Sequence, residues 1–308
     1  MSSISWATSV VSAALAAAVA AGGRAPAATH RFACADYTQG KVFLVGEDGE
    51  PVWEHDAPNS NDLSVLPDGN LLFTTGHGVL EVTPKDEVVF RYASESEIYA
   101  CQRLADGNTL VGESSTGRLL EVDPKGGIVK TLPLLAPGQE GGHAYMRNAR
   151  KLDNGHYLVA LFRDQVVREY DASGRVVWEA AAPGGAHSVE RLADGHTLVT
   201  TGDRGHQEPR LLELDADGAV VWQVSNDDLP DRPFRFLCGF HRQANGNVVV
   251  SNWLGHGELG KAPLLLEITR SKQVVWTYAR HDRLRTASSV VVLDDAHAAL
   301  GVHAVPGQ

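Results

Sequence analysis

Imidazole, guanidinium and phenol side chains stand at one position of a repeated sequence phrase. Eight residues before the glycine of successive copies come Tyr99, Arg147 and His187. Arginine offers two parallel N–H donors to a carboxylate or phosphate, and histidine can donate a hydrogen bond or act as a base near neutral pH. We therefore expect these groups to bind an anionic or polyhydroxylated ligand. The contrast with the net charge of the chain, which is −11, strengthens this expectation.

Other polar residues of the same and neighbouring positions complete the candidate site. The candidate catalytic residues are His187, Arg147 and Tyr145. The candidate ligand-binding residues are His143, Asn61, Tyr99, Arg235, Cys238, His241, Arg285 and Trp253. Alternation along an extended segment would place His143, Tyr145 and Arg147 on one side. Trp253 lies beside a long loop, outside the pattern of the other tryptophans, where it could stack on a sugar ring.

The remaining histidines of the loops and turns are weighed as metal ligands or as exposed turn residues. Asp203 and His206 fall in one loop and His256 in the next, and a metal there would need carboxylate and imidazole to meet in space. We predict no metal site. His156 and His196 fall in tight turns and are expected to be exposed to solvent. No G-x-S-x-G, H-E-x-x-H, P-loop or Rossmann fingerprint stands in a fitting context, which removes support from the familiar enzyme classes.

A phrase of the form Leu-x-Asp-Gly-x-x-Leu organises the chain. Its copies cover residues 66–72, 104–110, 152–158, 192–198 and, more weakly, 243–249, with a degenerate copy from 293. The glycines of the first five copies, the weak one included, are 38 to 51 residues apart. A second phrase trails each copy, such as Leu212-Glu213-Leu214-Asp215, and leads across a polar turn into Val220-Val221-Trp222 or its equivalent.

These phrases predict a β-propeller. Asp-Gly and Asn-Gly between short apolar runs favour two-residue hairpin turns with positive φ at both central residues, so each repeat predicts a four-stranded antiparallel blade. The repeat length matches the propeller period. Counting a blade completed by both chain ends, with residues 288–293 innermost and 42–53 as its outer pair, gives six blades. We therefore predict an all-β, six-bladed β-propeller, with residues 28–308 as a single domain.

Loop lengths predict which face carries the site. Strands alternate in direction, so the tight Asp-Gly turns gather on one face of the ring. The long segments 134–145, 202–210, 225–236 and 254–263 gather on the other. Binding residues concentrate on long loops held by a rigid scaffold. The site is therefore expected at the mouth of the central channel on the long-loop face.

Composition and the N-terminal segment narrow the class of protein. The chain is 43% hydrophobic and 21% charged, as in globular domains, and no basic cluster is present to bind nucleic acid or an anionic membrane. The uncharged run from Ala7 to Ala21 is too short for a membrane span, and Ala25-Pro26-Ala27 fits a signal peptidase site. We expect a signal peptide over residues 1–27 and a periplasmic or secreted protein. The cysteines Cys34, Cys101 and Cys238 are expected to be buried, with at most one disulfide.

The repeat from His187 to Leu198, followed by residues 212–215 and 220–222, resembles those of PQQ-like and arylsulfotransferase-like bacterial β-propellers. The resemblance covers nearly the whole chain after residue 30. In arylsulfotransferases a channel histidine receives the sulfuryl group, and the corresponding residue here would be His187, with Arg147 as an anion clamp. No cofactor is predicted, and PQQ is not expected because quinoprotein dehydrogenases resemble larger, eight-bladed rings.

Three functions remain open on the sequence. The first is an exported propeller that binds a small anionic or carbohydrate-like ligand, including an oligosaccharide, at the channel mouth. The second is an enzyme in which His187 is nucleophile or base for group transfer or for elimination from an acidic polysaccharide. The third is a noncatalytic scaffold that binds a protein partner through an apolar patch on the loop-rich face. Whether the protein is an enzyme is left undecided.

Overall fold

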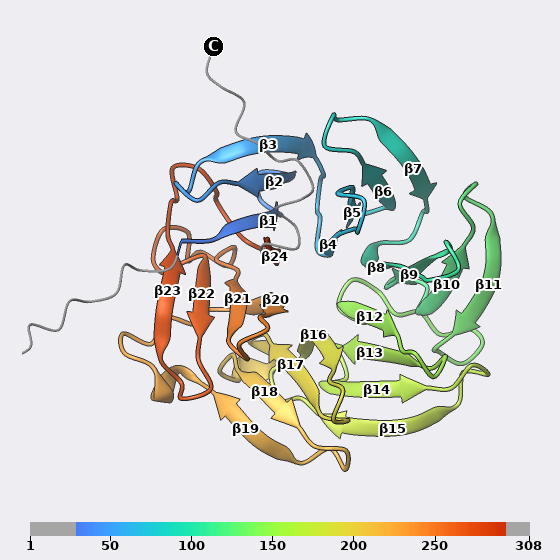
Figure 1. Cartoon of the computed structure of the whole chain (residues 1–308). Helices are drawn as coiled ribbons and strands as arrows, with labels where there is room; N and C mark the ends of the chain where they lie inside the picture. Colours follow the sequence, from blue (N-terminus) through green and yellow to red (C-terminus); the bar gives the residue numbers. More distant parts are fainter. Residues whose placement is uncertain (1–28, 294–308) are drawn as a thin grey trace, which may run out of the picture.

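Six four-stranded antiparallel sheets surround a central axis in the computed structural model, which describes residues 29–293 (Figure 1). We number the sheets as blades 1 to 6. The predicted six-bladed propeller is confirmed. From the innermost strand outward, blade 1 consists of β24 (Ser289–Leu293), β1 (Arg31–Asp36), β2 (Lys41–Val45) and β3 (Pro51–Asp56), and blade 2 of β4 (Leu63–Val65), β5 (Leu71–Thr74), β6 (Gly78–Val82) and β7 (Val88–Ala93). In the same order, blade 3 consists of β8 (Ile98–Arg103), β9 (Thr109–Glu113), β10 (Arg118–Val122) and β11 (Ile128–Pro133), and blade 4 of β12 (Asn148–Lys151), β13 (Tyr157–Leu161), β14 (Val166–Tyr170) and β15 (Val176–Ala181). Blade 5 consists of β16 (Ala186–Arg191), β17 (Thr197–Thr201), β18 (Leu211–Leu214) and β19 (Val220–Val224), and blade 6 of β20 (Leu237–Arg242), β21 (Val248–Asn252), β22 (Leu265–Ile268) and β23 (Val274–Tyr278).

The two ends of the described chain close the ring in blade 1. Strand β24 pairs antiparallel with β1, with Ser289 opposite Ala35. Beside this pair the fully buried carboxylate of Asp36 accepts hydrogen bonds from the backbone N–H of Arg285 (2.7 Å) and the hydroxyl of Thr286 (2.8 Å). It also accepts from the backbone N–H of Thr38 (3.0 Å). Asp36 therefore ties the segment before β24 to the β1–β2 turn.

The Asp-Gly phrases form tight hairpins of a different type from the predicted one. The N–H of Gly69 donates to the carbonyl of Leu66, and the N–H of Leu66 donates to the carbonyl of Asn70. Gly69 has a φ of 88°, whereas Asp68 is not among the residues with positive φ. This is a type I turn closed by a left-handed glycine, not a two-residue turn. The Asp68 side chain accepts from the N–H of Asn70, which explains why Asp or Asn precedes glycine.

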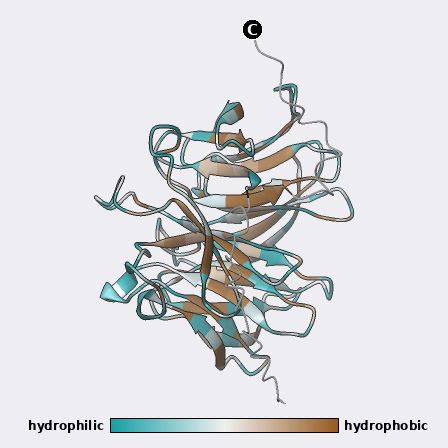
Figure 2. Ribbon diagram, turned by 60° about the vertical axis from the view of Figure 1, so that its left-hand side comes forward, coloured by the Kyte–Doolittle hydropathy of each residue, from teal (hydrophilic) through white to brown (hydrophobic). Residues whose placement is uncertain are grey.

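The hydrophobic core is divided into layers between adjacent blades. Between blades 2 and 3, for example, Leu72 and Val79 pack with Val111 and Leu120. Hydrophobic residues follow the strands, and hydrophilic residues follow the connections (Figure 2). The recurrent tryptophans of the outer strands pack against these layers, as predicted: Trp53, Trp178, Trp222 and Trp276. Each blade therefore covers the apolar faces of its neighbours, as ring closure requires.

The glutamate of the second phrase links each turn to a neighbouring group. Glu213 accepts from His196 Nδ1 at 2.8 Å, and Glu169 accepts from His156 Nδ1 at 2.6 Å. Both histidines are about one-third exposed in their turns, and each also has a carboxylate partner that the sequence analysis did not predict. Asn70 occupies the equivalent position in blade 2 and donates to Glu81.

Helical structure in residues 29–293 is limited to two 3₁₀ turns, η1 (Arg204–His206) and η2 (Asn226–Asp228). Neither is long and apolar enough to cross a membrane. All three cysteines are buried, as predicted, and none of them forms a disulfide within the described residues. The predicted signal peptide lies outside the described residues.

Candidate functional site

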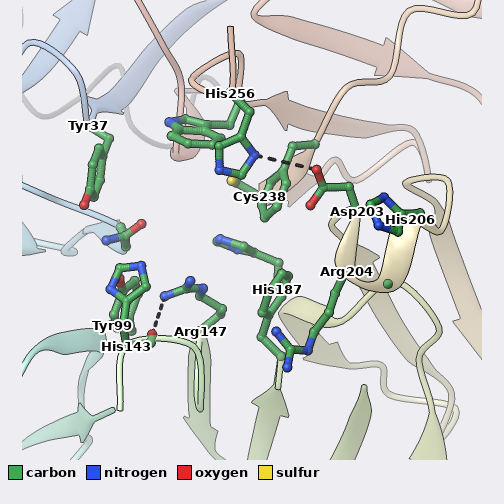
Figure 3. Close-up of a pocket in the computed structure, with 15 residues that line it drawn as sticks. Tyr37, Tyr99, His143, Arg147, His187, Asp203, Arg204, His206, Cys238 and His256 are labelled. Atoms are coloured by element: carbon green, nitrogen blue, oxygen red, sulfur yellow. Dashed lines mark hydrogen bonds and ion pairs between the residues drawn. The ribbon is translucent and has the colours of Figure 1, made fainter. Parts of the chain in front are cut away.

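A cavity of about 380 Å³ opens at the channel mouth on the long-loop face. Five of the six predicted strand-start positions line it: Asn61, Tyr99, Arg147, His187 and Cys238. The remaining lining residues come from loops: Tyr37, His143, Phe162, Asp203, Arg204, Gly205, His206, Phe236, Trp253 and His256 (Figure 3). The innermost strands of blades 2 to 6 thus begin around one opening. At the start of the sixth innermost strand, Ser288 is buried instead, with its hydroxyl within hydrogen-bond distance of the carbonyls of Ser60 (2.7 Å) and Ala35 (3.0 Å).

Arg147 is a buried cation at the floor of this cavity. Only 9% of its surface is exposed. Its guanidinium carbon lies 4.3 Å from the centroid of the Tyr99 ring and 5.1 Å from that of Phe162, and one N–H donates to the carbonyl of His143 at 2.8 Å. Within residues 29–293 no carboxylate forms an ion pair with it. Aromatic faces thus hold a positive charge that the described chain does not neutralise.

His187 lies next to Arg147 and is 4% exposed. Figure 3 shows its ring directed into the cavity beside the Arg147 guanidinium. The ring packs edge-on against Phe236, with centroids 5.6 Å apart, and has no hydrogen-bond partner in another described residue. Burial, followed by the charge of Arg147, lowers the pKa of His187 well below its usual value. The imidazole is therefore neutral at pH 7 and offers one donor and one acceptor.

His143, Glu97 and Tyr99 form one rim of the cavity. His143 Nδ1 lies 2.9 Å from Oε1 of Glu97 and 3.1 Å from the hydroxyl of Tyr99. Burial raises the pKa of Tyr99, so its hydroxyl stays protonated and can donate. The polar atoms of this rim are therefore largely occupied by one another.

Asp203 and His256 face each other on another part of the rim. His256 Nδ1 lies 3.6 Å from Oδ2 of Asp203, across two loops that leave blades 5 and 6. The His256 ring packs edge-on against Trp253 (4.7 Å) and Phe236 (5.8 Å). Carboxylate and imidazole thus meet here, but no group of three or more metal-binding side chains forms in the described part of the chain.

Part of the repeat region matches a known family. Residues 115–252 match the family described as outer membrane protein assembly factor BamB. The chain is a β-propeller with PQQ-like repeats. No curated protein matches its sequence.

Solved structures share the fold of this PQQ-like propeller. A protein of unknown function from Bacteroides caccae is 26% identical, with a TM-score of 0.74; the match covers 85% of this chain and 98% of that one. A streptogramin B lyase is 13% identical, with a TM-score of 0.57 and 85% of each chain covered. Virginiamycin B lyase from Staphylococcus aureus is 15% identical, with a TM-score of 0.54, over 81% of this chain and 84% of that one. The likeness to the two lyases concerns the fold alone.

Four predicted site residues of the PQQ-like propeller lie away from the cavity. Tyr145 is fully buried between blades 3 and 4, because His143 and Ala144 form a turn and the expected alternation fails there. The Arg235 side chain forms an ion pair with Glu258 at 3.0 Å. His241 follows on β20, opposite Val249, and does not line the cavity.

Arg285 is the fourth of these residues. It precedes the ring-closing strand β24, where its backbone N–H donates to Asp36. Its side chain does not line the cavity. Both arginines and His241 lie close in sequence to a strand start, but a shift of a few residues moves a side chain to another face of the blade.

Loops after the second strand of some blades supply cavity residues that the sequence analysis missed. Phe162 follows β13 and stands seven residues after Gly155. Trp253, which was predicted, holds the equivalent place seven residues after Gly246. The position seven residues after the repeat glycine therefore faces the cavity in blades 4 and 6, whereas Gly76, Ser114 and Gly202 at the same position do not line it. Phe236 and Tyr37 come from connections of irregular length, so their distance from a repeat glycine does not predict that they face the cavity.

Proposed function

We propose that this propeller binds a small anionic ligand in the cavity at the channel mouth, with Arg147 as the group that binds the anion. The observation that carries the proposal is the buried Arg147 guanidinium without a carboxylate partner in the described chain. Burying a charge is costly unless an opposite charge compensates it. A ligand carboxylate, sulfate or phosphate would supply that charge through a charge-assisted hydrogen bond.

His187 supports the same ligand chemistry. Its neutral ring can donate one N–H to an anionic oxygen without adding a second buried charge. The lining of the cavity is concave and mixed, with a few polar groups among aromatic rings, as in small-molecule sites. Arg147 and His187 together would therefore fix the anionic end of a ligand.

Calorimetric titration with sulfate, acetate, phenylacetate and glucuronate tests the proposal. At least one of these anions is expected to bind the wild type, and Arg147→Gln is expected to weaken it at least about tenfold. Arg103→Gln is the matched control, because Arg103 is also part-buried but is already paired with Glu81 outside the cavity. Equal affinities in wild type and Arg147→Gln would refute the proposal.

Histidine-based catalysis is a second candidate function. His187 favours it, because a neutral, cavity-facing imidazole beside a guanidinium can accept a proton while the cation stabilises negative charge. The reaction would be group transfer, as the resemblance to arylsulfotransferases implies, or elimination from an acidic sugar. Arg147 is the cation available for this role, because Arg235 is paired with Glu258 outside the cavity lining.

Two assays test the catalytic candidate. Release of nitrophenol from nitrophenyl sulfate reports group transfer, and ultraviolet absorbance of an unsaturated product reports elimination from polygalacturonate. His187→Gln should abolish the turnover found while keeping the melting temperature within a few degrees. Turnover that survives this substitution would exclude His187 as the base or nucleophile.

The scaffold alternative receives less support from the surface. It requires an apolar patch on the loop-rich face, yet Leu259 is the one large hydrophobic residue of the described loops that is exposed there. The other exposed large hydrophobics belong to the outer strands, as Val89 and Val129 do. Those two fall at β-bulges, which discourage pairing between sheet edges.

The proposed location rests on sequence alone. We propose export to the periplasm or secretion, because the uncharged run of residues 7–21 and the Ala25-Pro26-Ala27 site fit a signal peptide. Fractionation of bacteria that express the whole chain, with N-terminal sequencing of the product, tests this. A mature N-terminus near residue 28 is expected, and an uncleaved product in the cytoplasm would contradict it.

A further inference from the structure

Aromatic rings dominate the wall of the cavity above Arg147. Phe236 is the centre of this wall: its ring lies 5.8 Å from Phe162 and 5.5 Å from Trp253, measured between centroids. Tyr37 packs edge-on against Trp253 at 6.2 Å. Figure 3 shows Tyr37 and His256 above Arg147 in the view, with the His187 ring between Arg147 and His256. A ligand held at Arg147 therefore extends toward aromatic surface.

Several polar groups of the lining already have partners. The amide of Asn61 donates to the carbonyl of Asn59, Tyr99 contacts His143, and Asp203 faces His256. Burial raises the pKa of the Cys238 thiol, which keeps it a weak donor. Arg147 and His187 are the buried polar groups of the described lining that face the cavity with bonding capacity to spare.

This distribution separates two classes of anion. A sugar acid carries several hydroxyl groups, each of which loses hydrogen bonds to water when it is buried without a new partner. An aromatic acid carries one charged group and one flat apolar surface. One buried cation, one neutral imidazole and an aromatic wall match the second class at both ends of the ligand.

We propose that the ligand of this cavity is an aromatic carboxylic acid, with its carboxylate on Arg147 and His187 and its ring against Phe236 and Trp253. The inference rests on the proposed anion-binding function and selects the chemical class of the anion. The cavity, at about 380 Å³, accommodates an aromatic ring with a short acidic side chain.

Three matched compounds test the class of ligand by calorimetry on the wild-type protein. Phenylacetate carries both features, phenylacetamide has the ring without the charge, and glucuronate has the charge without the aromatic ring. We expect phenylacetate to bind at least about tenfold more tightly than either of the others. Trp253→Leu should weaken phenylacetate at least about fivefold and change the affinity for glucuronate less than twofold.

Two further variants keep the test interpretable. Trp253→Phe retains an aromatic face and should restore most of the phenylacetate affinity, even if the leucine variant is poorly folded. Trp178→Leu removes a tryptophan of an outer strand, far along blade 4 from the cavity, and should leave affinity unchanged.

The outcomes distinguish the two levels of the proposal. If glucuronate binds as tightly as phenylacetate or more tightly, and Arg147→Gln abolishes that binding, the aromatic class is wrong and the anion site stands. If phenylacetamide binds as tightly as phenylacetate, the carboxylate is not recognised, and both the aromatic-acid proposal and the anion site are wrong. If none of the anions binds in a way that depends on Arg147, both are likewise overturned.

Discussion

The guanidinium carbon of Arg147 lies 4.3 Å from the centroid of the Tyr99 ring. The two residues occupy the same position of successive repeats, at the start of the innermost strands of blades 4 and 3. The ring attracts the cation through its quadrupole, and the carbonyl of His143 fixes the cation from a second side. The pair therefore holds a positive charge in place before a ligand arrives, which is the arrangement an anion site needs.

Arg147→Met should remove anion binding without loss of stability. In the free protein the buried guanidinium is an uncompensated charge, and a linear apolar side chain avoids that cost. We expect the free energy of unfolding to stay equal or rise by up to about 2 kcal/mol, as measured by urea denaturation without ligand. A loss of more than about 1 kcal/mol would mean that Arg147 is primarily a structural residue.

His187 should make the protein less stable in mild acid. Its pKa is lowered in the folded state, so below the unfolded value near 6.5 the unfolded chain binds a proton that the folded chain does not. Stability therefore falls as pH drops below about 6.5, by up to about 1.4 kcal/mol per pH unit for this group. His187→Gln should show a shallower decline between about pH 6.5 and 5 in denaturation at several pH values. Parallel curves for the two proteins would contradict this.

His196 should have the opposite effect on the pH dependence of stability, because it stabilises the protein in mild acid. Its hydrogen bond to Glu213 raises its pKa in the folded state. The stabilising contribution is then fully present below the unfolded pKa and is lost as pH rises through the folded pKa. His196→Asn places the residue that Asn70 and Asn247 show at equivalent turns. The asparagine variant should match the wild type in melting temperature above about pH 8 and melt lower near pH 6. A difference in melting temperature between the two proteins that grows toward high pH would contradict this prediction.

Asp36 should be the residue on which ring closure depends most. Its buried carboxylate accepts from backbone and hydroxyl groups on both sides of the closure, and Asp36→Ala leaves those donors buried without an acceptor. We expect a loss of about 3 to 5 kcal/mol in urea denaturation. Asp68→Ala, in an exposed turn of blade 2, should lose about 1 kcal/mol or less. Similar losses for both would show that Asp36 has no special role in closure.

The architecture could be predicted from the sequence because each repeat contains the residues that form its own hairpin turn. Asp68 and Gly69 mark a hairpin whose local hydrogen bonds do not depend on the rest of the ring. The same regularity predicted that Tyr99, Arg147 and His187 would meet around one opening. Only the turn type was wrong, because Asp68 keeps a negative φ and glycine alone takes the left-handed conformation.

The remaining cavity residues depend on irregular segments. Tyr145 turns into the core because the chain bends at His143 and Ala144, and no periodic pattern marks that bend. Phe236 reaches the cavity from a connection between blades whose path is set by contacts distant in sequence, such as the packing of Phe236 on Phe162. Phe162, in contrast, follows a repeat position that recurs at Trp253.

A crystal of the protein soaked with bromophenylacetate tests the central claim most directly, because the bromine and the carboxylate report the two ends of the ligand separately. The expected result is carboxylate density within hydrogen-bond distance of Arg147, with the bromine signal beside Trp253. Bromine density elsewhere, or a carboxylate that avoids Arg147 in a fully occupied cavity, would contradict the account.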